Sequence, residues 1–178
     1  FSHSHSPGIA VGGHCIPIYP RFYQWNDPSA TVVAAARRAN ADMPDYTVGL
    51  LADIHGDLAG QRVAVLGASY RGGVKETAFS GVFPTVEALK ARGAQALVHD
   101  PMYSDSELRA LGLDPYHWGE PVDAGIVQSD HRAYASIGST DLPARTLVDG
   151  RRILDGARFG SATVAQLGAG SGGDGADA

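Results

Sequence analysis

The sequence predicts an α/β fold: a Rossmann-like parallel sheet preceded by an active-site loop and a connecting helix. Short, wholly apolar segments such as residues 63–66 alternate along the chain with segments of helical periodicity such as residues 82–92. Parallel strands are apolar throughout because both of their faces are covered. Strands that alternate with helices pair in parallel through right-handed crossovers. The hydrophobic content of 44% and the charged content of 19% are those of a globular chain.

Residues 1–58 are predicted to contain a loop and then the helix. Residues 1–28 are rich in Ser, His, Gly and Pro, and Pro17 should end any helix that begins near it. Aromatic side chains gather late in this loop, at Tyr19, Phe22, Tyr23 and Trp25. We expect these aromatic side chains to pack against other residues rather than to bind a sugar.

The connecting helix should begin at Asp27, a plausible N-cap, because Pro28 suits the first helical position. Alanine and valine then recur at helical spacing. Pro44 should break or kink this helix near Asp42, because proline lacks an N–H and clashes with the preceding turn. A second helical stretch should continue to Gly56.

Residues 59–160 are predicted to form the α/β domain and residues 161–178 a disordered tail. The expected strands are residues 63–66, 96–100, 122–128 and 145–148, and the expected helices are residues 82–92 and 105–111. Ser104 and Glu107 have the spacing of a capping box at the start of the second helix. From Gly168 onward, the composition of Gly, Ser, Ala and Asp cannot bury a core.

The overall composition argues against several classes of protein. A net charge of −5 does not suit a nucleic-acid-binding protein, which would carry a basic surface. No apolar run approaches the ~20 residues that span a bilayer, so we expect no membrane partner. A single cysteine excludes a disulfide framework and fits a reducing, cytoplasmic compartment. Because Phe1 lies close to a probable site loop, we expect a fragment of a longer protein.

The strongest functional signal is Cys15, which follows Gly12, Gly13 and His14. Glycine lets a backbone approach a ligand closely. A thiol displayed on such a loop can attack a bound electrophile. A lone cysteine can also be a small buried hydrophobic residue, and the flanking glycines favour the nucleophile.

The segment from Gly12 to Pro17 resembles the active-site loop of the UDP-glucose/GDP-mannose dehydrogenase family. It is most similar to the branch that acts on UDP-N-acetylhexosamines, in which a histidine precedes the cysteine. Three further segments resemble the family in the same order: residues 36–44, 65–71 and 98–101. The resemblance extends from Pro7 to about Asp155.

The resemblance implies the C-terminal part of a nucleotide-sugar 6-dehydrogenase, which oxidises the C6 alcohol of a UDP-sugar to a carboxylate with two NAD⁺. Cys15 would hold the sugar as a thiohemiacetal and then as a thioester. Gly12 and Gly13 would let the substrate approach the backbone. Neighbouring side chains on a loop usually point apart, so we assign His14 to the substrate pocket rather than to the role of base. The family also implies a homodimer.

In the nucleotide-binding domain, the resemblance makes Arg71 the best candidate for a diphosphate contact. The family has an arginine where this chain has Ala78, and we expect Lys75 to compensate, with Ser80 as a further contact. The family also has an aspartate where this chain has Tyr19. No residue can be assigned to NAD: the family's Gly-x-Gly-x-x-Gly turn is missing, and we interpret Asp100 as a strand-end turn residue.

Two alternatives remain open. Residues 61–155 could form a non-catalytic nucleotide-sugar-binding or assembly module. His3, His5, His14 and Cys15 could instead supply metal ligands, although adjacent residues seldom share one tetrahedral site. We predict no metal site.

Overall fold

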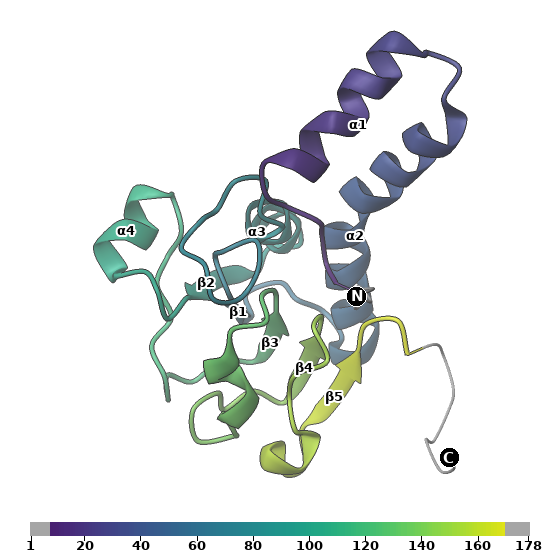
Figure 1. Cartoon of the computed structure of the whole chain (residues 1–178). Helices are drawn as coiled ribbons and strands as arrows, with labels where there is room; N and C mark the ends of the chain where they lie inside the picture. Colours follow the sequence, from purple (N-terminus) through teal and green to yellow (C-terminus); the bar gives the residue numbers. More distant parts are fainter. Residues whose placement is uncertain (1–7, 170–178) are drawn as a thin grey trace, which may run out of the picture.

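The computed structural model describes residues 8–169, which contain a five-stranded parallel sheet (Figure 1). The strands are β1 (Arg62–Leu66), β2 (Gln95–His99), β3 (Ala124–Val127), β4 (Thr146–Asp149) and β5 (Thr163–Gln166). Their spatial order is β2-β1-β3-β4-β5, and every neighbouring pair is parallel. The predicted fold class is therefore confirmed.

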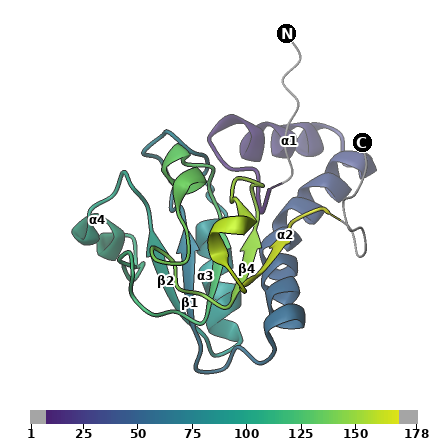
Figure 2. The same cartoon turned by 90° about the horizontal axis from the view of Figure 1, so that it is seen from below.

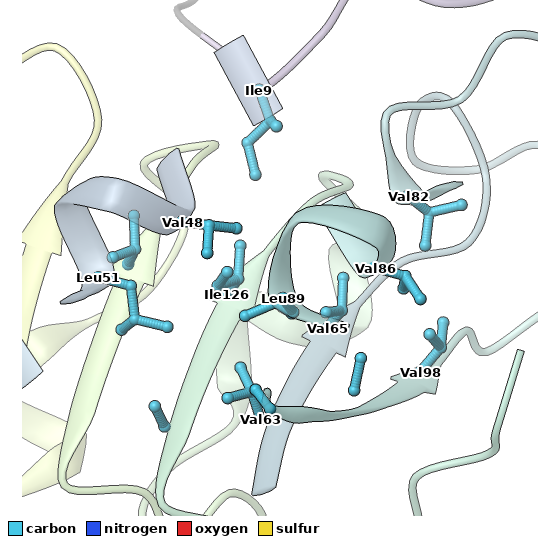
Figure 3. Close-up of a cluster of buried hydrophobic side chains, with 14 of the residues drawn as sticks. Ile9, Val48, Leu51, Val63, Val65, Val82, Val86, Leu89, Val98 and Ile126 are labelled. Atoms are coloured by element: carbon cyan, nitrogen blue, oxygen red, sulfur yellow. The ribbon is translucent and has the colours of Figure 1, made fainter. Parts of the chain in front are cut away.

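Alternate residues of each strand cover the two faces of the sheet, as the period of two requires. Val63 and Val65 point to the face covered by α3 (Val82–Ala91) and by the second half of α2 (Thr31–His55). Figure 3 shows this cluster, in which Val48 and Leu51 of α2 and Leu89 of α3 lie over the sheet. The other face is covered by two short 3₁₀ helices and by loops, which contribute Tyr116, Tyr134, Leu142 and Phe159.

The helices of the sheet domain start and end where the sequence predicts. In α4 (Asp105–Ala110), the Ser104 side chain accepts the amide of Glu107, and the Glu107 side chain accepts the amide of Ser104. The predicted capping box is confirmed. Helix α3 ends before Gly93, whose φ of 76° suits a residue without a Cβ.

The prediction that residues 1–28 form a loop is wrong for its second half, because α1 occupies Cys15–Asn26. Pro17 lies in the first turn of α1, where a missing N–H removes no intrahelical hydrogen bond. Pro20 lies inside the same helix. Helix α1 and the first half of α2 form a hairpin that projects from the sheet domain, while the second half of α2 packs against the sheet (Figures 1 and 2).

The predicted start and break of the connecting helix are also wrong. Ala30 is the N-cap of α2, while Asp27 caps the end of α1 and accepts hydrogen bonds from Ser29. Helix α2 continues through Pro44 to His55. The hydroxyl of Thr47 donates to the carbonyl of Met43 next to the proline, at 2.8 Å, and burial of the following turns against the sheet favours the continuous helix.

Strand β5 lies within residues 161–178, which we predicted to be disordered. Residues 163–166 pair with β4 in parallel register. They form an edge strand that is only half-buried, so its apolar pattern is weak. Residues 170–178 lie outside the described residues. Between residues 8 and 169, no helix has the length and apolar character needed to cross a membrane.

Candidate functional site

Cys15 is exposed and is the first residue of α1. The segment before it is fixed by contacts to two other elements. The amide of Val11 donates to Oδ1 of Asn40 on α2, at 2.8 Å, and the amide of Gly13 donates to the carbonyl of Ala78, also at 2.8 Å. The thiol therefore lies at the start of α1, directly after a segment that is bonded to the loop after β1.

Gly12 and Gly13 are required for this contact. A Cβ on Gly12 would lie 2.6 Å from the Cβ of Tyr70 and 2.7 Å from the carbonyl oxygen of Phe79, closer than real side chains approach. Gly13 has a φ of 88°, which favours glycine. The two glycines thus let the cysteine segment lie against the loop after β1. This packing explains why glycine is needed here, independently of the role toward a substrate that we predicted.

His14 forms a pair with an acidic residue of the same loop. Its Nε2 lies 3.1 Å from Oε2 of Glu76, and Oε1 of Glu76 accepts the amide of Ala78 at 2.9 Å. These two hydrogen bonds hold the pKa of the Glu76 carboxyl below its ordinary value. Glu76 is therefore ionised near neutral pH and connects the loop after β1 to the residue before Cys15.

Arg71 lines a cavity of about 570 Å³, together with Gly12. The remaining lining residues include Ala10, Val11, Ile16, Tyr70, Asp130, Arg151, Arg152 and Ile153. The cavity lies where the strand order reverses, because β2 and β3 flank β1 on opposite sides and the lining residues include loop residues that follow β1, β3 and β4. Ligands of open α/β sheets bind at such positions, outside the carboxyl ends of the strands. Three arginines make this cavity attractive to an anion.

The cavity is organised by Asp130, at the end of β3. Its Oδ1 accepts the amide of Gly72 at 2.7 Å, and its Oδ2 lies 3.2 Å from Nη2 of Arg151. Partial burial opposes ionisation of Asp130, but the hydrogen bond from Gly72 and the charge of Arg151 hold its pKa below the ordinary value. Asp130 thus fixes both the Arg71 loop and the Arg151 side chain.

Arg151 and Arg152 are site residues that the sequence reasoning missed. They follow β4 in the segment Asp149-Gly150-Arg151-Arg152. Fully buried Asp149 accepts the amides of Arg151, Ile153 and Leu154 and so shapes this turn. An acid, a glycine and two arginines directly after a buried strand would have been a usable signal, because carboxyl ends of parallel strands share one edge.

Lys75 and Ser80 do not line the cavity of Arg71. Nζ of Lys75 lies 2.5 Å from Oε1 of Glu107 on α4, and this hydrogen bond lowers the pKa of Glu107 to about 2. Ser80 is buried, and its hydroxyl accepts the amide of Val82 at the start of α3. In this structure Lys75 is thus engaged with α4, and the hydroxyl of Ser80 is engaged with the first residue of α3.

Asp100 does not fit the role of the acid that holds the ribose of a dinucleotide. Oδ2 of Asp100 accepts the amides of Ala68 and Ser69, each at 2.9 Å, and lies 3.1 Å from Nε2 of His131. Its Oδ1 accepts the amide of Met102. Asp100 is only 3% exposed, so both oxygens are already used and neither can hold a ribose. This agrees with its interpretation as a strand-end turn residue.

No group of three or more His, Cys, Asp or Glu side chains within residues 8–169 could hold a metal ion. His3 and His5, which belong to the metal alternative, lie outside the described residues.

Comparison with known proteins assigns this arrangement to a family. A family profile described as "UDP-glucose/GDP-mannose dehydrogenase family, UDP binding domain" matches residues 64–156. These residues hold β1 to β4 and both Arg71 and Arg151. The chain belongs to this family.

Individual relatives agree with the family profile. The chain is 31% identical over 139 residues to a UDP-N-acetyl-D-mannosamine dehydrogenase from Methanococcus maripaludis, a match that covers 77% of the chain and 32% of the relative. It is similar to the structure of a UDP-D-ManNAc dehydrogenase from Pyrococcus horikoshii, with a TM-score of 0.73 and 25% identity over 92% of the chain and 40% of that structure.

A second similar structure is a UDP-glucose dehydrogenase from Pyrobaculum islandicum, with a TM-score of 0.75, 26% identity, and coverage of 89% of the chain and 38% of that structure. The chain therefore spans about a third of the length of the curated relatives it matches.

Proposed function

We propose that this chain supplies the nucleophile and the UDP-binding domain of an NAD-dependent nucleotide-sugar 6-dehydrogenase. The observation that carries the proposal is that one cavity is lined both by Arg71 and by Gly12, three residues before Cys15. A nucleotide diphosphate held by the arginines would thus lie beside the segment that presents the thiol. The dinucleotide would bind to parts of the protein other than the described residues and would accept the hydride.

In this proposal, Arg71, Arg151 and Arg152 bind the diphosphate. Guanidinium groups suit phosphate oxygens because their planar donors form paired, charge-assisted hydrogen bonds. The side chain of Arg151 is 18% exposed and is already oriented by Asp130, so little conformational entropy is lost when an anion binds. Lys75 and Ser80 remain candidates only if the loop after β1 rearranges around the substrate.

Cys15 would act on the sugar. Its exposed side chain at the start of α1 is accessible to a bound sugar, and the thiolate is the nucleophilic form of cysteine. The thiolate sulfur adds to the carbonyl carbon of a C6 aldehyde, a C–S bond forms, and the oxygen takes a proton to give a thiohemiacetal. After oxidation to a thioester, water cleaves the C–S bond, releasing the carboxylate and the thiol.

Tyr19 occupies the position of the aspartate that the resemblance led us to expect. It lies four residues after Cys15 on α1 and therefore on the same side of that helix, with 64% of its surface exposed. Unlike an aspartate, a tyrosine supplies no carboxylate that could accept a proton. Another group must therefore assist proton transfer at the thiol or at the thioester.

The substrate we propose is a UDP-N-acetylhexosamine. His14 before Cys15 is the feature that favours this branch, and named relatives in both comparisons are UDP-N-acetyl-D-mannosamine dehydrogenases. The second candidate is a non-catalytic binding or assembly module. This module, made of residues 61–155, is favoured by the arginines of the cavity, whose lining does not include Cys15. The exposed aromatic side chains of α1 support the proposed homodimer.

Substitution Cys15→Ser in the whole protein tests the proposal. We expect the variant to lose at least ~10³-fold in NAD⁺ reduction with a UDP-N-acetylhexosamine, because the hydroxyl is a much weaker nucleophile. UDP binding, measured by calorimetry, should stay within about twofold, since the arginines are unchanged. Full NAD⁺ reduction in the Cys15→Ser variant would show that Cys15 is not the nucleophile. UDP binding without any NAD⁺ reduction by the wild type would support the binding module.

A further inference from the structure

Glu76 has a place in this site that the family resemblance did not assign. Its carboxylate contacts His14, the residue next to Cys15. Glu76 also belongs to the same loop as Arg71. The amide of Tyr70, the residue before Arg71, donates to the carbonyl of Glu76 at 3.0 Å. This hydrogen bond holds Glu76 close to the start of the loop. The contact with His14 therefore joins the cysteine segment to a loop that is held by its own hydrogen bond.

The hydrogen bonds of Glu76 determine which nitrogen of His14 carries a proton. An ionised carboxylate can only accept hydrogen bonds. Oε1 already accepts the amide of Ala78, and Oε2 faces Nε2 of His14. Nε2 must therefore be the donor. In the neutral ring this leaves Nδ1 as the acceptor, and Nδ1 is the nitrogen nearer to the backbone that continues into Cys15.

We propose that Glu76 is a positioning residue for Cys15, acting through His14. Glu76 keeps the proton of His14 on Nε2, so that Nδ1 takes the proton that leaves Sγ of Cys15. The products are a thiolate and an imidazolium, and the net charge does not change. The imidazolium in turn is stabilised by the Glu76 carboxylate. This inference rests on the proposed function, and it supplies a proton acceptor at a site where Tyr19 replaces the expected aspartate. It also revises the sequence-based assignment of His14, which placed this side chain in the substrate pocket rather than in the role of base, because the sequence does not indicate the contact with Glu76.

The pair is suited to orientation rather than to stability. The side chains of His14 and Glu76 are 67% and 43% exposed, and exposed ion pairs contribute little to folding. The other titratable groups near this pair are Tyr70, whose ring lies against Gly13, and Tyr103, with Lys75 over its ring. Tyr19 lies further along α1. Glu76 is the group that bonds to His14, so its removal should matter.

The test is Glu76→Gln in the whole protein. The glutamine oxygen can still accept the amide of Ala78, and its NH₂ group then faces His14. Nε2 must become the acceptor, which moves the ring proton to Nδ1, as in a catalytic triad whose acid is replaced by its amide. The substitution therefore reverses the tautomer without changing the shape of the side chain.

We expect the alkylation rate of Cys15 at pH 7, followed by peptide mass spectrometry, to fall about tenfold in Glu76→Gln, the equivalent of one pKa unit of the thiol. The alkylation pH profile should shift upward. The kcat for UDP-sugar oxidation should fall by a similar factor, while KM and UDP affinity stay within about twofold. Glu120→Gln is the matched control, because Glu120 forms a similar exposed pair with His117 outside the candidate site.

A double-mutant cycle with His14→Asn decides whether the effect passes through His14. We expect Glu76→Gln to cause no further loss in the His14→Asn background. A full additional loss there, or an unchanged alkylation profile in Glu76→Gln, would overturn the inference. Either result would leave the proposed function intact, since that function fails only if Cys15→Ser retains activity.

Discussion

The two ends of helix α2 lie in different surroundings. Near its C-terminus, Val48 and Leu51 are completely buried between the sheet and α3. Near its N-terminus, Val32 is 80% exposed, and on the adjacent α1 Phe22 and Trp25 are 63% and 85% exposed. The sheet domain completes its own core, whereas the helical hairpin presents large apolar side chains to solvent. Such surfaces mark interfaces, which is why we assign the proposed homodimer contact to the hairpin.

The largest difference between the two ends should appear in unfolding experiments on Leu51→Ala. Removing this fully buried side chain should lower the free energy of unfolding by about 3 kcal/mol, from lost apolar burial and the cavity left behind. Val32→Ala on the same helix is the control and should change it by less than about 0.5 kcal/mol. Chemical denaturation measures both. Equal losses would mean that the hairpin has a core of its own.

A smaller effect should follow acidification, and it concerns only the sheet domain. Burial lowers the pKa of half-buried His99 to about 4, against 6.5 for a free histidine. The unfolded chain therefore binds a proton between pH 6.5 and 4 that the folded chain does not, so stability falls as the pH falls through this range and this contribution levels off below pH 4.

If His99 were fully buried, this difference in pKa would lower the free energy of unfolding by about 3 kcal/mol on acidification. Because His99 is partly exposed, we expect a loss of about 2 kcal/mol. Denaturation of the wild type and of His99→Asn at pH 6.5 and pH 4.5 measures it. The variant should lose less stability on acidification, because asparagine does not titrate. Parallel pH profiles would show that His99 is not responsible.

The smallest effect on folding should come from Trp25→Ala, which removes the most exposed aromatic side chain of the hairpin. The free energy of unfolding should change by less than about 0.5 kcal/mol. The mass of the whole protein in light scattering should nevertheless shift toward the monomer, whereas the exposed Glu87→Ala on α3 should leave it unchanged. A monomeric wild type, or an unchanged mass for Trp25→Ala, would remove the hairpin as the dimer contact.

The same contrast explains which elements could be predicted from sequence. β1 to β4, α3 and α4 follow local signals: continuous apolar runs, a capping box and a glycine after the last turn. Helix α1 contradicts such signals, because Pro17 and Pro20 resemble helix breakers and no capping side chain marks its start. Residues 163–166 are too short and too polar to indicate an edge strand without β4 beside them.

The site divides in a similar way. Cys15 and Arg71 lie in segments that resemble the family, and the structure places Arg71 in the cavity where the nucleotide is proposed to bind. Arg151 is 80 residues further along the chain, and only the strand order brings it to Arg71. Glu76 depends on a contact between residues 62 apart in sequence. Tertiary contacts of this kind have no local pattern.

The tight fit of Gly12 against Tyr70 and Phe79 has a consequence for protein engineering. The segment from residue 8 to 14 and the loop from residue 70 to 80 meet without room for one methyl group. A chimera that takes its nucleotide-binding domain from one homologue and its thiol segment from another would therefore join two mismatched surfaces. Grafts intended to change sugar preference should exchange both segments as a single cassette.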